Sequence, residues 1–116
     1  MKKKISITDS ELEIMKVLWE LEEATSSEIF EALDKNRSTL KTLLLRLVQK
    51  GMVGYEEITS RIYRYIPLVS RNDYISYSRK SLIEKAFDGS AQKMLLNFVK
   101  EEKITKEELE NLIKNL

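Results

Sequence analysis

The sequence of 116 residues contains no cysteine and no histidine. Their absence removes thiol nucleophiles, imidazole general bases and the usual protein ligands of zinc, copper and haem. Glycine occurs only at Gly51, Gly54 and Gly89, which leaves no glycine-rich loop for binding phosphate. We therefore expect neither an enzyme nor a bound cofactor or metal.

Long apolar runs are also missing. No segment approaches the ~20 apolar residues that a membrane-spanning helix requires. Three lysines, Lys2 to Lys4, follow the first methionine, but no apolar stretch comes after them, so we predict no signal peptide. These features predict a cytoplasmic protein with one domain, or one small domain with an appendage.

Charge of each sign is concentrated in a different part of the chain. The net charge is only +1, but residues 5–34 carry one base and nine acids, a net of −8. Residues 35–64 carry seven bases and two acids, a net of +5. A polyanion would be attracted to the second segment and repelled by the first, which would orient a DNA-binding domain.

Two capping boxes mark the starts of the first two predicted helices. The segment Thr8-Asp9-Ser10-Glu11 opens a helix at about 9–22, and Thr25-Ser26-Ser27-Glu28 opens a second at 25–33. Both helices repeat apolar residues at helical spacing, so each is expected to pack one face on a shared core. Trp19 is expected to belong to that core rather than to a functional site.

The third predicted helix, 37–50, has two different faces. Leu40, Leu43, Leu44 and Leu47 recur at i, i+3, i+4 and i+7, and Gly51 stands where a helix end is expected. The opposite face carries cations and hydroxyls, which are the groups that contact phosphates and base edges. An ordinary amphipathic helix with a solvated basic face would give the same pattern.

After the third helix, the spacing of the apolar residues changes from the helical repeat to the alternation of a strand. Residues 52–58 and 61–66 read as two strands joined by a short turn, and Pro67 ends the second strand. Three helices followed by a hairpin predict a mainly α fold, a winged helix-turn-helix domain at 1–69. The alternative is a small α+β domain with no role in DNA binding.

In a helix-turn-helix, the second helix enters the major groove while the first crosses the DNA backbone. Here the helix at 25–33 would position the helix at 37–50, with the hairpin tip beside an adjacent phosphate or minor groove. Arg46 is expected to meet phosphate, although it could instead pair with an acid of the first helix. Thr39 and Thr42 could equally be residues that the helix merely tolerates. The predicted DNA-contacting residues are Arg37, Ser38, Thr39, Lys41, Thr42, Arg46, Thr59, Ser60 and Arg61.

Residues 70–116 read as a helical dimerisation domain, with helices expected at about 71–87, at about 90–101 and after a capping box at Thr105. A segment of this length has too few helices to enclose its own apolar surface. We therefore expect the same segment of a second copy of the chain to cover that surface. The alternative is that these helices pack back onto the first domain. In a dimer, the two copies of the helix at 37–50, here called the reader helix, would lie about one DNA turn (~34 Å) or a multiple apart. This spacing predicts a palindromic target. The predicted interface residues are Tyr74, Leu82, Ile83, Phe87, Leu95, Phe98, Leu109, Leu112, Ile113 and Leu116.

Three segments resemble the BlaI/MecI/CopY family of bacterial winged-helix repressors, most of all its penicillinase repressor branch. They are the opening Thr8–Trp19, the strand Tyr63-Arg64-Tyr65 and the block Thr39–Gly51, of the form T-x-x-T-x-x-x-R-L-x-x-K-G. The resemblance implies a homodimeric repressor of double-stranded DNA. Its palindromic operator would lie upstream of β-lactamase, penicillin-binding-protein or metal-export genes.

The resemblance also implies how repression would be relieved. In the β-lactam branch a membrane sensor protease pathway leads to cleavage of an Asn–Phe bond, and Asn97-Phe98 is the matching pair here. The copper-responsive branch ends in a Cys-x-Cys cluster, which this chain lacks. Arg37-Ser38 stands where β-lactam repressors often carry Pro-Lys, so their operator preference does not transfer directly. The alternatives are a family repressor answering another signal and a winged-helix adaptor that binds protein.

Overall fold

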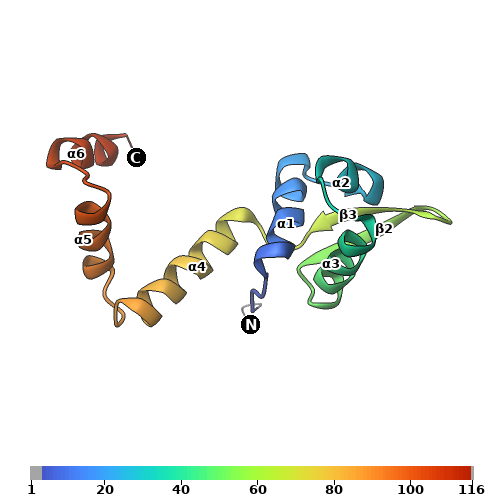
Figure 1. The fold of residues 1–116 in the computed structure, drawn as a ribbon, viewed down its shortest axis with the longest axis horizontal. Helices are drawn as coiled ribbons and strands as arrows, with labels where there is room; N and C mark the ends of the chain where they lie inside the picture. The colour runs from blue at the N-terminus through green and yellow to red at the C-terminus, as the bar shows by residue number, and fades with distance from the viewer. Residues whose placement is uncertain (1–3, 116) are drawn as a thin grey trace. The chain divides into compact units, whose positions relative to one another are not determined.

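The computed structural model describes residues 4–115 and is shown in Figure 1. The predicted order of three helices and a hairpin is confirmed, and the fold is a winged helix-turn-helix followed by three further helices. Leu116, which we predicted at a dimer interface, lies outside the described residues. The elements are α1 (Asp9–Leu21), β1 (Ala24–Thr25), α2 (Ser26–Ala32), α3 (Arg37–Gln49), β2 (Val53–Thr59), β3 (Ile62–Pro67), α4 (Arg71–Ala86), α5 (Ala91–Glu101) and α6 (Lys106–Lys114).

Two of the three predicted capping boxes form in full, at the starts of α1 and α2, whereas at α6 only the Thr105 side chain accepts its bond, from the Glu108 backbone. The Thr8 side chain accepts a hydrogen bond from the Glu11 backbone, and the Glu11 carboxylate accepts one from the Thr8 backbone. Thr25 and Glu28 repeat the same reciprocal pair at α2. The two boxes satisfy N–H groups that the first turn of a helix otherwise leaves without partners.

The sheet has three antiparallel strands in the order β1-β3-β2. The β2–β3 hairpin is the wing, with Tyr55 paired to Tyr65. The two-residue strand β1 pairs Ala24 with Tyr65 and Thr25 with Arg64, which ties the α1–α2 connection to the wing. We did not predict β1, because two residues are too short to show the alternation that identifies a strand.

One hydrophobic core joins α1, α2, α3 and the base of the wing. The predicted leucine stripe of α3 is confirmed, because Leu40, Leu43, Leu44 and Leu47 are all at most 6% exposed. They belong to the same buried cluster as residues of α1, α2 and β2. Figure 1 shows these three helices grouped beside the hairpin. The core therefore holds α3 by one face and leaves its other face free.

Trp19 connects α1 to the start of α4. Its indole Nε1 donates a hydrogen bond of 2.8 Å to the Val69 carbonyl. Its ring centroid lies 5.7 Å from that of Tyr74, and the Arg71 guanidinium carbon lies 5.6 Å from the Trp19 ring centroid. The compact unit that contains the winged helix accordingly extends to Ile75. Trp19 is thus a structural residue, as predicted.

The second compact unit begins at Ser76 and contains the rest of α4 with α5 and α6. No residue in α4, α5 or α6 is buried. In the part of the chain that the structure describes, no helix is both long and apolar enough to cross a membrane. Several large apolar side chains in this unit are 41–61% exposed, namely Leu82, Leu95, Leu96, Phe98, Leu112 and Ile113.

The carboxylate of Glu11 joins the start of α1 to the end of α3. Its Oε1 accepts hydrogen bonds from the Lys50 ammonium at 2.6 Å and from the Thr8 backbone at 2.9 Å, and the residue is 1% exposed. Burial alone would raise the pKa of Glu11, but these hydrogen bonds and the charge of Lys50 outweigh it and hold the pKa below its ordinary value. The ionised form is therefore the one that stabilises the fold.

We predict that Glu11→Gln lowers the free energy of unfolding at pH 7 by about 1.5–3 kcal/mol, the usual worth of a hydrogen bond to a charged group. A depressed folded-state pKa gives stability that is present above the unfolded pKa and lost as the pH falls through the folded one. The difference between wild type and variant should therefore shrink as acid protonates Glu11. Urea unfolding from pH 7 down to the acidic pH at which Glu11 is protonated measures this difference in unfolding free energy.

The matched control is Glu20→Gln, which changes an exposed glutamate on the same helix. Its unfolding free energy should stay within about 0.5 kcal/mol of wild type. Equal stability of the Glu11 and Glu20 variants at pH 7 would contradict a stabilising role for the Glu11–Lys50 pair.

Candidate nucleic-acid interface

The ends of α3 are fixed by specific local contacts. The Asn36 side chain accepts a 2.8 Å hydrogen bond from the Ser38 backbone and so caps the helix. At the other end Gly51 adopts a φ of 78°, and its N–H donates to the Val48 carbonyl at 3.0 Å. Such a positive φ is strained for residues that carry a Cβ, so glycine suits this helix end.

The turn between α2 and α3 is held to α1 by an ion pair between Lys35 and Glu13. Together with the Glu11–Lys50 pair, it connects α1 to both ends of α3. Neither pair is evident from the sequence, where Arg46 was the cation considered as a partner of an α1 acid. Lys50 takes that role because it follows the last turn of α3, beside the capping box of α1.

The structure exposes every α3 residue that we predicted to contact DNA. Arg37, Ser38 and Thr39 lie in the first turn of α3, and Lys41, Thr42 and Arg46 follow along the exposed side. The Thr42 hydroxyl donates a 3.1 Å hydrogen bond to the Ser38 carbonyl within the helix. This bond occupies the hydroxyl proton and leaves the threonine methyl group free to meet another apolar group.

The predicted wing residues Thr59, Ser60 and Arg61 form the exposed tip of the β2–β3 hairpin. Figure 1 shows the hairpin projecting beyond the helices of the winged-helix unit. A projecting tip is the geometry that a wing needs if it is to reach a phosphate or a groove beside the one occupied by α3.

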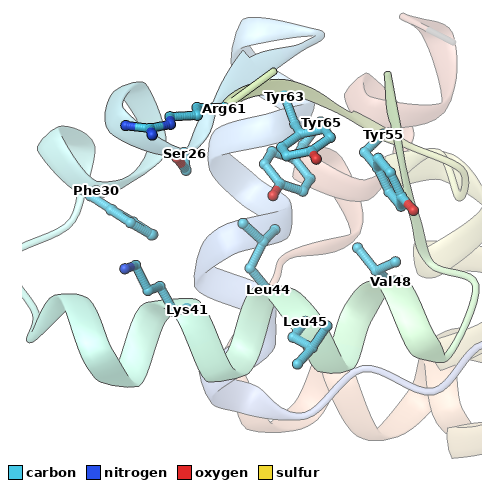
Figure 2. Close-up of a pocket in the computed structure, with 10 residues that line it drawn as sticks. All are labelled: Ser26, Phe30, Lys41, Leu44, Leu45, Val48, Tyr55, Arg61, Tyr63 and Tyr65. Atoms are coloured by element: carbon cyan, nitrogen blue, oxygen red, sulfur yellow. The ribbon is translucent and has the colours of Figure 1, made fainter. Parts of the chain in front are cut away.

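A groove of about 550 Å³ lies between α2, α3 and the inner face of the wing. Figure 2 shows Lys41 on the α3 side of this groove and Arg61 on the opposite side, with Ser26 and Phe30 contributed by α2. The structure therefore brings together a predicted contact of the reader helix and a predicted contact of the wing on one open surface.

Three tyrosines form the face of the wing that turns toward α3. The ring centroid of Tyr55 lies 5.5 Å from that of Tyr63, edge to face, and 6.3 Å from that of Tyr65. Burial, followed by the neighbouring Tyr63 and Tyr55, raises the pKa of Tyr65 above its ordinary value, so its hydroxyl stays protonated. Tyr63 and Tyr65 lie two residues apart on β3, which places both side chains on one face of the strand.

The cations of residues 35–64 separate into two groups. Ion pairs engage three of them, because Lys35 meets Glu13, Lys50 meets Glu11, and Arg64 meets Glu23 and Glu56. Within residues 4–115 the other four make no ion pair, and all four belong to the predicted DNA-contacting set. These cations are Arg37, Lys41, Arg46 and Arg61.

Comparison with known proteins places the whole chain in one group. Residues 7–116 match the family described as penicillinase repressor. A penicillinase repressor of Bacillus licheniformis is 33% identical over 97% of this chain and 90% of its own length. The methicillin resistance regulatory protein MecI of Mammaliicoccus sciuri is 30% identical over 95% of this chain and 92% of its own.

Two solved structures resemble the winged-helix part. The DNA-binding domain of the repressor BlaI superposes with a TM-score of 0.56 at 35% identity, over 64% of this chain and 94% of that one. The monomeric form of Bacillus licheniformis BlaI, in complex with the blaP half-operator, superposes with a TM-score of 0.54 at 36% identity and the same coverage. From the family match along its length and these relatives, the chain belongs to the penicillinase repressor family.

Proposed function

We propose that this protein is a homodimeric transcriptional repressor. In this proposal α3 lies in the major groove of a palindromic operator, the wing tip contacts the adjacent backbone, and the helices after the winged helix join two copies. Such a repressor would act in the cytoplasm. The observation that carries the proposal is the distribution of the cations of residues 35–64, because the four that make no ion pair within residues 4–115 all lie on α3 and the wing tip.

An unpaired cation on a protein surface is available to replace the counterions of a phosphate backbone. Lys35, Lys50 and Arg64 have acidic partners and serve the fold. The other four cations of residues 35–64 lie along one face of α3 and at the tip of a projecting hairpin, a spacing suited to a groove and the phosphates beside it. A half-operator complex of the BlaI relative supports the same use of the fold.

The apolar surface of the C-terminal helices supports dimerisation. In α6, Leu109, Leu112 and Ile113 repeat at i, i+3 and i+4 and form a stripe that no other described element buries. A second copy would cover such a stripe and would also pair two reader helices on a two-fold symmetric site. The remaining interface residues that we predict are half-buried or exposed in the single chain: Tyr74, Leu82, Ile83, Phe87, Leu95 and Phe98.

We propose that cleavage between Asn97 and Phe98 relieves repression, as the family resemblance implies. Both residues lie within α5 and are exposed. Cleavage there would separate α6 and the second half of α5 from the DNA-binding unit. Loss of the dimer would remove bivalent attachment to a two-site operator, which weakens binding without touching the reader helix. A membrane sensor protease pathway responding to β-lactams is the proposed source of the cut.

An adaptor that uses the winged helix to bind protein is the second candidate, and a family repressor answering another signal is a variant of the first. The side chains of Leu45, Tyr55, Tyr63 and Tyr65 line the groove, and they do not by themselves distinguish DNA from protein as the partner. The salt dependence of binding distinguishes the repressor from the adaptor, because phosphate contacts make the affinity for DNA fall steeply with salt.

We predict that Lys41→Ala weakens binding to a promoter fragment from the gene's own upstream region by about tenfold or more, the usual worth of a side chain that reads a base edge. Lys16→Ala is the matched control, because Lys16 is an exposed lysine on α1, within the acidic segment. Electrophoretic shifts at two salt concentrations measure both variants.

Thermal unfolding of both variants should match wild type, since neither lysine is buried. If Lys41→Ala and Lys16→Ala bind with the same affinity at low and at moderate salt, Lys41 is not a contact. If the wild-type chain shows no salt-sensitive binding to that fragment, the repressor proposal is wrong.

We predict that the intact chain sediments as a dimer and that a chain ending at Asn97 sediments as a monomer, since truncation removes the apolar stripe of α6. Leu112→Glu in the full-length chain should weaken the dimer in the same direction. Leu21→Glu changes an exposed leucine of α1 and should leave the dimer unchanged. A stable dimer of the truncated chain would instead assign the main interface to α4.

A further inference from the structure

Leu45 is an apolar residue on the exposed side of the reader helix. It is 57% exposed, whereas the neighbouring Leu44 is 4% exposed and belongs to the core. Figure 2 shows Leu44 pointing from α3 toward Tyr63 and Tyr65, and both Leu44 and Leu45 line the groove between α3 and the wing. The sequence pattern assigned only Leu40, Leu43, Leu44 and Leu47 to the buried stripe and gave Leu45 no role.

The helical spacing places Leu45 in the middle of the exposed face. At 100° per residue, Leu45 lies one turn after Lys41 and Thr42 and two turns after Ser38, between the directions of the lysine and the threonine. The other exposed residues of α3 are all polar: Arg37, Ser38, Thr39, Lys41, Thr42, Arg46 and Gln49. Leu45 is therefore the one exposed residue of α3 whose side chain is wholly apolar.

We propose that Leu45 is a specificity-determining residue that contacts the 5-methyl group of a thymine in the major groove. The inference rests on the proposed binding of α3 to DNA. In that groove the base edges present hydrogen-bond donors and acceptors, and the thymine methyl is the apolar group among them. A leucine that lies at the midline of the helix cannot make a hydrogen bond there, so a thymine is the base that suits it.

The surrounding charge identifies DNA as the partner of this surface. Lys41, Arg46 and Arg37 share the exposed side of α3 with Leu45, and none of them has an acidic partner within residues 4–115. A protein partner that buried Leu45 would also have to bury or neutralise these cations, which a DNA groove does with its own phosphates. Thr42 also has a free methyl group on this face, so the experiment must separate the two residues.

The probe is the tightest duplex that full-length protein selects from a random library of about 30 base pairs, or three helical turns. Each thymine is replaced in turn by deoxyuracil, which removes the 5-methyl group and nothing else. One thymine in each half-site should weaken wild-type binding about fourfold when replaced, the worth of one buried methyl-sized group. The Leu45→Ala variant should bind the thymine and deoxyuracil duplexes equally.

Two further variants make the result specific to Leu45. Leu21→Ala changes an exposed leucine on α1 and should keep the fourfold sensitivity of wild type. Leu45→Met keeps an apolar side chain of similar volume. Its binding should therefore also weaken about fourfold when the thymine is replaced by deoxyuracil. All three leucine variants should unfold at the wild-type temperature, because neither position is in the core.

The inference is overturned if no thymine position is sensitive, or if Leu45→Ala retains the loss seen with wild type. The effect of replacing thymine by deoxyuracil could disappear in Thr42→Ser but persist in Leu45→Ala. That result would assign the methyl contact to Thr42 and would also overturn the inference. Failure of the protein to select any duplex would overturn both this inference and the proposed function. Salt-sensitive binding with no Leu45-dependent thymine effect would overturn this inference alone.

Discussion

The attachment of α3 to α1 is the constraint on which the rest of the molecule depends. Leucines at helical spacing bury one face of α3 in the core, and the buried carboxylate of Glu11 holds Lys50 at the end of the helix. A buried charge without its partner is costly, so this pair also penalises any displacement of α3 along α1. The consequence is a helix whose exposed face is presented in one orientation, which a helix that reads DNA requires.

The acidic and basic segments of the sequence are not simply two opposite faces. Several acids of the first segment neutralise cations of the second, through the pairs of Glu11, Glu13 and Glu23. Among residues 35–64, the cations that have no acidic partner in the described part of the chain are those of α3 and the wing tip. The same charge asymmetry therefore serves folding and, in our proposal, selects the surface that a polyanion can approach. Acids elsewhere on the domain would repel DNA from other orientations.

Much of the winged helix could be predicted because its signals are local. Capping boxes at Thr8 and Thr25 and the period of the α3 leucines depend on neighbours within a turn or two, and the structure confirms them. The pairing of Glu11 with Lys50 joins residues 39 positions apart, and β1 is too short to show a period. Such contacts depend on how helices pack, which a single sequence does not reveal. Leu45 was given no role because DNA contacts were sought among cations and hydroxyls, although its helical spacing already places it off the buried leucine stripe.

In our proposal the exposed face of α3 and the wing tip bind DNA together. The most direct measurement is the change in backbone amide chemical shifts when the duplex selected by the protein is added to the labelled chain. We expect the largest changes along Arg37–Arg46 and at Thr59–Arg61, with small changes on the acidic outer side of α1. Large changes confined to α1 or to the C-terminal helices, with α3 unaffected, would contradict it.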